Sequence, residues 1–192
     1  MPDRGLESLG QSLLALAHQA ISGHFGLRFE SPLLNADDPR LGEPGATFVT
    51  LTQEGQLRGC IGSLTPWRTL EQDVRANAVA AAFHDSRFLP LEVAELAHTR
   101  IEVSRVGPAT EMTFADEADA LAQLRDHPGL ILDCRWERRE HRATFLPQVW
   151  ESLPIPRDFL EALKRKAGLP AHFWSPDLRL SRYAVDKWKE PA

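Results

Sequence analysis

The stretch Phe48-Val49-Thr50-Leu51-Thr52-Gln53-Glu54-Gly55-Gln56-Leu57-Arg58-Gly59-Cys60-Ile61-Gly62 decides the fold, because it has the composition of a β-hairpin. The β-branched and aromatic residues of 48–51 are typical of a strand, and the polar segment 53–56 predicts a turn before a return strand over 57–61. Successive side chains point to opposite faces of a strand. We therefore expect Arg58 and Cys60 side by side on one face, and either Phe48 or Val49 opposite Cys60.

Helices and further strands surround this hairpin. Thr69 and Gln72 have the spacing of a capping box, which predicts a helix running to about Phe83. The residues of 99–106 alternate between apolar and polar, as in a half-buried strand. Other predicted elements are helices over 6–21, 90–96, 115–127 and 156–167, a hairpin of strands 130–132 and 143–146, and a last strand over 178–185. Together they predict an α+β fold with a mostly antiparallel sheet and flanking helices.

Length, charge and cysteine content narrow the class of protein. The 192 residues, 43% of them hydrophobic, suit one domain of 1–192 with a full core. A formal net charge of −5 argues against a nucleic-acid-binding protein. Two cysteines do not make a disulfide framework, and no apolar run approaches the roughly 20 residues that span a bilayer. We expect a cytoplasmic protein with reduced thiols and no membrane partner.

The strongest candidate site is Cys60, which lies beside Arg58 and between Gly59 and Gly62. An arginine can hold an anion or lower the pKa of a thiol, and glycines allow close approach to the backbone. Cys60 is therefore a candidate nucleophile or redox centre. The alternative is a structural role, because free cysteine is among the most buried residue types. Cys134, in a charged hairpin without a neighbouring glycine, is interpreted as structural.

Other polar residues complete the candidate ligand-binding set. Arg58 and Arg87 could clamp a carboxylate or phosphate, or could form ion pairs with Asp85 or Glu102. Asp85 and Glu102 could in turn act as an acid–base pair, or simply satisfy an arginine. Gln148 follows a proline and could line a cleft or bind the backbone of its own turn.

Metal and cofactor signatures are absent from the sequence. The seven histidines form no His-x-x-x-His pair, and there is neither a Cys-x-x-Cys pair nor a glycine-rich phosphate-binding motif. We therefore predict no metal and no cofactor. His84 could serve Cys60 as a general base, but a histidine at the end of a helix is also a common structural residue.

Six blocks of the sequence, in order, resemble the AMME-region protein family: 58–62, 85–91, 101–104, 129–130, 146–149 and 166–170. That family is named after a human chromosomal region linked to Alport syndrome and elliptocytosis. Its bacterial and archaeal members are called AmmeMemoRadiSam system protein A. The resemblance covers about 9–188, although the arginine-rich hairpin between Asp133 and Thr144 departs from what the family would lead us to expect.

The resemblance implies an α+β domain with a larger lobe, a smaller lobe and a cleft near the cysteine motif. It also implies two partners, a Memo-like protein and a radical S-adenosylmethionine protein, which are encoded beside the prokaryotic members. Those neighbours point to a shared modification pathway. The resemblance implies no particular reaction.

Two functions follow from these patterns. In the first, the protein is a component of a modification pathway, with a ligand-binding cleft at the 58–62 motif and Cys60 as a candidate catalytic residue. In the second, it is a non-catalytic scaffold or adaptor whose motif is structural. An enzyme predicts a solvent-reachable Cys60 with a perturbed pKa in a concave site. A scaffold predicts a buried Cys60 and an exposed apolar patch elsewhere.

Overall fold

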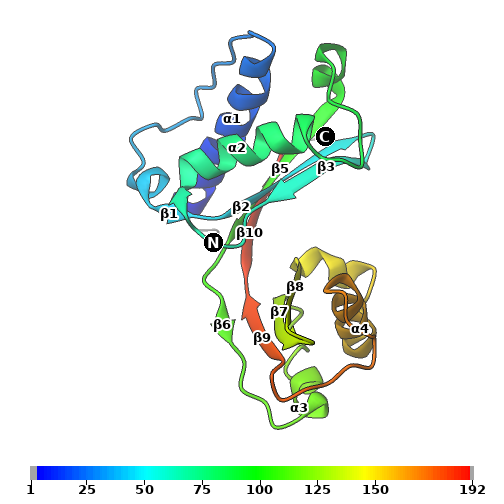
Figure 1. Cartoon of the computed structure of the whole chain (residues 1–192). Helices are drawn as coiled ribbons and strands as arrows, with labels where there is room; N and C mark the ends of the chain where they lie inside the picture. The colour runs from blue at the N-terminus through cyan, green and yellow to red at the C-terminus, as the bar shows by residue number, and fades with distance from the viewer. Residues whose placement is uncertain (1–3, 191–192) are drawn as a thin grey trace. The chain divides into compact units, whose positions relative to one another are not determined.

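The computed structural model describes residues 4–190, which divide into two compact units (Figure 1). Unit 1 contains the chain up to Val106 and the segment from Asp186 onward. Unit 2 contains Gly107–Val185 and is thus inserted between two segments of unit 1. Helices combine with antiparallel strand pairs in both units, which confirms the α+β class. The cleft between a larger and a smaller lobe stays a prediction.

Unit 1 is a four-stranded sheet in the order β10-β5-β2-β3, with two helices packed on it. β2 pairs antiparallel with both β3 and β5, so it lies inside the sheet, and β3 lies at an edge. A two-stranded ribbon of β1 and β4 precedes the second helix. The bounds are α1 Arg4–His24, η1 Pro39–Gly42, β1 Pro44–Gly45, β2 Thr47–Gln53, β3 Gln56–Gly62, β4 Arg68–Thr69, α2 Leu70–Phe83, η2 Val93–His98, β5 Thr99–Val106 and β10 Val185–Lys189.

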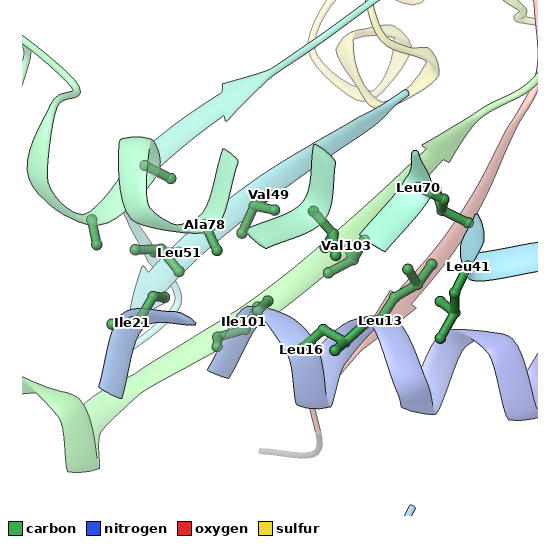
Figure 2. Close-up of a cluster of buried hydrophobic side chains, with 14 of the residues drawn as sticks. Leu13, Leu16, Ile21, Leu41, Val49, Leu51, Leu70, Ala78, Ile101 and Val103 are labelled. Atoms are coloured by element: carbon green, nitrogen blue, oxygen red, sulfur yellow. The ribbon is translucent and has the colours of Figure 1, made fainter. Parts of the chain in front are cut away.

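The core of unit 1 lies between this sheet and the two helices (Figure 2). Period-two alternation points Val49 and Leu51 of β2 and Ile101 and Val103 of β5 to the same side, where all four are buried. From the helices, the core residues include Leu13, Leu16, Ile21, Val74, Ala78 and Ala81. The many alanines of α2 let its backbone approach the sheet closely. Within residues 4–190, no helix has both the length and the apolar character needed to cross a membrane.

The predicted capping box is present at the start of α2. The Thr69 side chain accepts from the Gln72 backbone N–H, and the Gln72 side chain accepts from the Thr69 N–H. One turn later, Asp73 is fully buried and its carboxylate accepts hydrogen bonds from four residues. These donors are the Thr47 backbone and hydroxyl, the Ser63 hydroxyl, Arg68 Nε and Asn77 Nδ2, at 2.7–2.9 Å. The carboxylate therefore joins α2 to the start of β2 and to the segment after β3.

The C-terminal strand closes unit 1 against its first helix. A Cβ on Gly10 of α1 would lie 2.2 Å from the ring of Trp188 in β10, so this position needs a glycine. On β5, the Ile101 N–H donates to the Glu190 carboxylate and the Ile101 carbonyl accepts from the Glu190 N–H, both at 3.0 Å. The chain thus returns from unit 2 to complete the sheet of unit 1.

Unit 2 is a second four-stranded sheet, in the order β6-β9-β7-β8, with its own apolar core. Phe159, Leu160 and Leu163 of α4 are buried in that core, and the helix ends before Gly168, which has a φ of +79°. Lys164 is also buried and pairs with Glu117 of α3 at 2.6 Å. The bounds are β6 Thr110–Glu111, α3 Glu117–Ala122, β7 Gly129–Trp136, β8 Arg139–Phe145, η3 Pro147–Glu151, α4 Pro156–Lys166 and β9 Arg179–Tyr183.

Three predicted elements differ in the structure. The helix expected over 115–127 is limited to α3, and His127, which precedes a proline, has a φ of 54° outside the helical range. The short helix expected over 90–96 is the 3₁₀-helix η2, which starts three residues later. The last strand expected over 178–185 is interrupted at Ala184 and continues as two strands in different sheets, β9 and β10.

We predict that Asp73→Ala lowers the free energy of unfolding by about 3–5 kcal/mol, because it leaves buried donors and the Arg68 guanidinium without their acceptor. Urea unfolding monitored by circular dichroism measures this loss. The matched control is Glu71→Ala on the same helix, whose ion pair with Arg75 is exposed. That control should change stability by no more than about 0.5 kcal/mol. Equal losses in both variants would contradict a special role for Asp73.

Candidate functional site

The β2–β3 hairpin has a two-residue turn at Glu54 and Gly55 and a bulge on β3. Gln53 pairs with Gln56 and Thr52 with Leu57, but Leu51 pairs with Gly59, so Arg58 is the extra residue. This insertion moves the register by one position. Thr50, not Phe48 or Val49, therefore lies opposite Cys60. Without the bulge, Val49 would have held that place.

Both glycines of the motif accommodate other parts of unit 1. A Cβ on Gly59 would lie 2.2 Å from the carbonyl oxygen of Ala81, so this glycine lets helix α2 approach the strand. A Cβ on Gly62 would lie 2.2 Å from the ring of Phe48, its cross-strand neighbour. The close approaches that the sequence predicted at these two positions are thus made by the protein itself.

Each guanidinium nitrogen of Arg58 donates to the segment that follows α2. Its Nε and Nη2 each donate to the carboxylate of Glu95, at 2.8 and 2.9 Å. Its Nη1 donates to the Leu89 carbonyl at 2.9 Å, and Nη2 also reaches the Pro90 carbonyl at 3.4 Å. The ion pair expected with Asp85 or Glu102 is therefore formed with Glu95 instead. Arg58 fastens the 89–95 segment to the hairpin.

Asp85 and Arg87 make a second set of hydrogen bonds, to the backbone of Cys60. The Cys60 N–H donates to Asp85 Oδ2 at 2.9 Å, and Arg87 Nη2 donates to the Cys60 carbonyl at 3.3 Å. Arg87 also binds Asp85 through Nε and Nη2, at 2.9 and 2.6 Å. These hydrogen bonds hold the pKa of Asp85 well below its usual range, with the Arg87 side chain as the main cause. The predicted ion pair between these two residues is present.

The Cys60 thiol is half-buried on the sheet face opposite the helices. Burial is the main influence on its pKa, which is raised above the ordinary value. A hydrogen bond from the Thr50 hydroxyl, at 3.3 Å, and the charge of Arg87 oppose that rise without reversing it. The sequence had assigned the activating charge to Arg58, whose guanidinium is committed to Glu95. Burial therefore disfavours the thiolate, which is the form that nucleophilic chemistry needs.

Glu102 continues the polar row that begins at Cys60. Thr50 pairs with Cys60 on one side and with Glu102 on the other, and Glu102 lies 3.7 Å from the Lys187 ammonium. The structure thus brings five sequence candidates together around β3: Arg58, Cys60, Asp85, Arg87 and Glu102. Sequence reasoning missed Thr50, Glu95 and Lys187. Of these, only Thr50 carried a local signal, its place in the hairpin.

Three further candidates belong to other elements. His84 is exposed and is the C-cap of α2, where its backbone N–H donates to the Ala80 carbonyl. Gln148 belongs to η3 of unit 2, so its predicted role beside the motif is untested. Cys134 is buried in the core of unit 2, and burial raises its pKa as well. Among residues 4–190, no three histidine, cysteine or acidic side chains gather as a metal site would require.

A surface hollow of about 500 Å³ lies beside the Arg58–Glu95 ion pair. It is lined by the β2–β3 turn on one side and by η2 on the other: Gln53, Glu54, Gln56, Leu57, Arg58, Ala94, Glu95 and His98. Three large apolar side chains of β3, of η2 and of the segment before η2 are exposed: Leu89 by 83%, Val93 by 54% and Leu57 by 43%. We call these three residues the Leu89 surface.

Comparison with known proteins identifies the family. A model of the AMMECR1 family matches residues 14–188, which is nearly the whole chain. The chain belongs to the AMMECR1 family. This confirms the resemblance inferred from the six sequence blocks.

Relatives of the AMMECR1 family share both sequence and fold with the chain. A protein of Methanothermobacter thermautotrophicus is 32% identical over 192 residues, covering 94% of each chain. A protein of Aeropyrum pernix is 36% identical over 162 residues, covering 79% of this chain and 66% of its own. The crystal structure of an uncharacterised protein from Pyrococcus horikoshii superposes with a TM-score of 0.81 at 28% identity, covering 94% of this chain and 91% of that one. These relatives bring no activity to the site.

We predict that Cys60 reacts slowly with a small alkylating reagent at pH 7, because burial raises the pKa of its thiol. The measurement is the alkylation rate across pH in a Cys134→Ser background, with the unfolded protein as the reference for a free thiol. The apparent pKa of the folded protein should exceed the reference value. A folded-state pKa below the reference would reveal an activated thiolate and would restore Cys60 as a catalytic candidate.

We predict that the stability contributed by the Arg58–Glu95 ion pair is lost in acid. The Arg58 side chain lowers the pKa of Glu95 from 4.5 to about 2, so its contribution is present above pH 4.5 and is lost as the pH falls toward 2. The loss should be about 1–2 kcal/mol, since the carboxyl is partly screened by solvent. Urea unfolding between pH 2 and 7 measures it. Glu95→Gln should have a flatter profile across this window, and an unchanged profile would contradict the assignment.

Proposed function

We propose that this protein is a non-catalytic binding component, a scaffold or adaptor, and that the 58–62 motif holds its docking surface in place. The observation that carries this proposal is the state of Arg58. All three of its guanidinium nitrogens donate to the 89–95 segment, so four of its five N–H groups are committed to that segment. The Arg58 guanidinium therefore holds in place the segment that contains the exposed Leu89.

The Leu89 surface has the properties of a pre-organised docking site. The Leu89 side chain is 83% exposed, but its backbone is held in place. Its carbonyl accepts from Arg58, and two residues later the Leu91 N–H donates to the Ala82 carbonyl of α2 at 2.8 Å. A segment that is held in one conformation loses little entropy when it binds. An exposed apolar group that is rigidly held, with a hollow beside it, supports recognition of another protein.

The partners that we propose are those implied by the family resemblance, the Memo-like protein and the radical S-adenosylmethionine protein. In this proposal the chain acts with them in a modification pathway, and holds or delivers a substrate without performing the chemistry itself. We place the complex in the cytoplasm, which suits the two free thiols, Cys60 and Cys134.

A small anionic ligand near Arg87 is the second candidate function. The Arg87 side chain is 55% exposed, and its Nη1 has no hydrogen-bond partner within residues 4–190. Such a ligand would lie beside the Cys60 backbone. Titration with inorganic phosphate and with acetate, followed by calorimetry, tests this candidate, and absence of heat with both anions would reject it.

We predict that Leu89→Asp weakens binding to the partner about tenfold or more, because it places a charge in an apolar contact. Calorimetric titration of purified chain with the purified Memo-like protein, and separately with the purified radical protein, measures the affinity. The matched control is Ile155→Asp, which changes a 56% exposed apolar side chain at the start of α4 in unit 2.

The control should bind like the unchanged protein. If neither partner binds the unchanged chain, the partner proposal is wrong. If a partner binds and both aspartate variants bind equally well, the Leu89 surface is not the docking site.

A further inference from the structure

Strand β3 is an edge strand, and within residues 4–190 no further strand pairs with its outer side. An edge strand presents backbone N–H and carbonyl groups that can pair with a strand from another molecule. At Cys60, both of these groups are directed away from β2 and both are occupied by side chains. Asp85 accepts from the N–H at 2.9 Å, and Arg87 donates to the carbonyl at 3.3 Å.

The Asp85–Arg87 pair thus offers the same chemistry as a residue of a neighbouring antiparallel strand. Such a residue accepts with its carbonyl and donates with its N–H to a single residue across the ladder. Here the carboxylate replaces the carbonyl, and the guanidinium replaces the N–H. The two side chains are held together by hydrogen bonds of 2.9 and 2.6 Å, and Asp85 is only 6% exposed, so the arrangement is fixed.

We propose that the Asp85–Arg87 pair is a strand surrogate, which closes the edge of β3 and keeps the chain from pairing with a second copy there. The occupant that the surrogate excludes is the β3 edge of another molecule, because two identical edges can pair antiparallel about a two-fold axis. This role concerns self-association, so it stands independently of the docking function proposed for the Leu89 surface.

The chain contains a second pair of the same kind, which serves as a matched control. Asp38 and Arg40 have the same spacing, and Arg40 donates to Asp38 through Nε at 2.9 Å and through Nη2 at 2.6 Å. That pair caps η1 and also reaches the Gly5 carbonyl of α1. It therefore has the same charges and a similar burial of its aspartate, but it binds a helix and not a strand edge.

The experiment compares Asp85→Ala/Arg87→Ala with Asp38→Ala/Arg40→Ala by sedimentation velocity over a wide range of protein concentration. Amide hydrogen exchange, read by NMR, is measured on the same samples. We expect the Cys60 amide to exchange about ten- to a hundredfold faster in dilute Asp85→Ala/Arg87→Ala, because it loses a hydrogen bond to a charged acceptor. At high concentration this variant should associate and the amides of β3 should regain protection.

The control and the unchanged protein should remain monomeric with a protected Cys60 amide. Association of the control to the same extent would show a general effect of destabilisation, and would overturn the proposal. So would a variant that stays monomeric while its Cys60 amide exchanges freely, or one that associates without protection of β3. If the double variant does not fold, Arg87→Met keeps the aliphatic stem and Asp85, and the same association should appear at higher concentration.

Discussion

The buried carboxylate of Asp73 is the constraint on which unit 1 depends. It binds groups from the start of β2, from the segment after β3, from β4 and from its own helix, so four separate parts of the chain must be in place together. A buried charge is tolerated only when its hydrogen bonds are made, and the Asp73 carboxylate accepts five of them. Asp73 thereby sets the position of α2 on the sheet. That position brings α2 close to Gly59 of β3. It also places the loop after α2 where its side chains bind β3.

The cysteine motif then has a physical explanation that needs no ligand. The two glycines admit a helix backbone and an aromatic ring, while Arg58 and the Cys60 backbone hold the segment 85–95. The thiol lies at the centre of this arrangement, but the groups around it do not activate it. Small size and limited polarity suit Cys60 to a crowded strand position, in the way that free cysteine is used in protein interiors. The residues of this site therefore serve to hold the 85–95 loop in one position.

Local features of this fold could be predicted from the sequence, and distant ones could not. The capping box at Thr69 depends on residues three positions apart, and the strand over 99–106 on simple alternation, so both were found. The bulge at Arg58 has no local signature and changes the face and the partner of each residue beyond it. Glu95 lies 37 residues from Arg58, and nothing in either segment indicates that they meet. For the same reason the ion-pair partners of the candidate site could be narrowed to acidic residues but not chosen among them.

The insertion of unit 2 between β5 and β10 has a consequence for biosynthesis. Unit 2 is one continuous segment, so its own sheet can form as soon as Val185 has left the ribosome. Unit 1 includes α1, yet the Trp188 ring that covers Gly10 is made only after the whole of unit 2. Unit 1 therefore remains incomplete until all of unit 2 has been made, with one edge of its sheet uncovered on the nascent chain. Loss of β10 would uncover α1 at Gly10, although all of unit 2 lies between the two elements in the sequence.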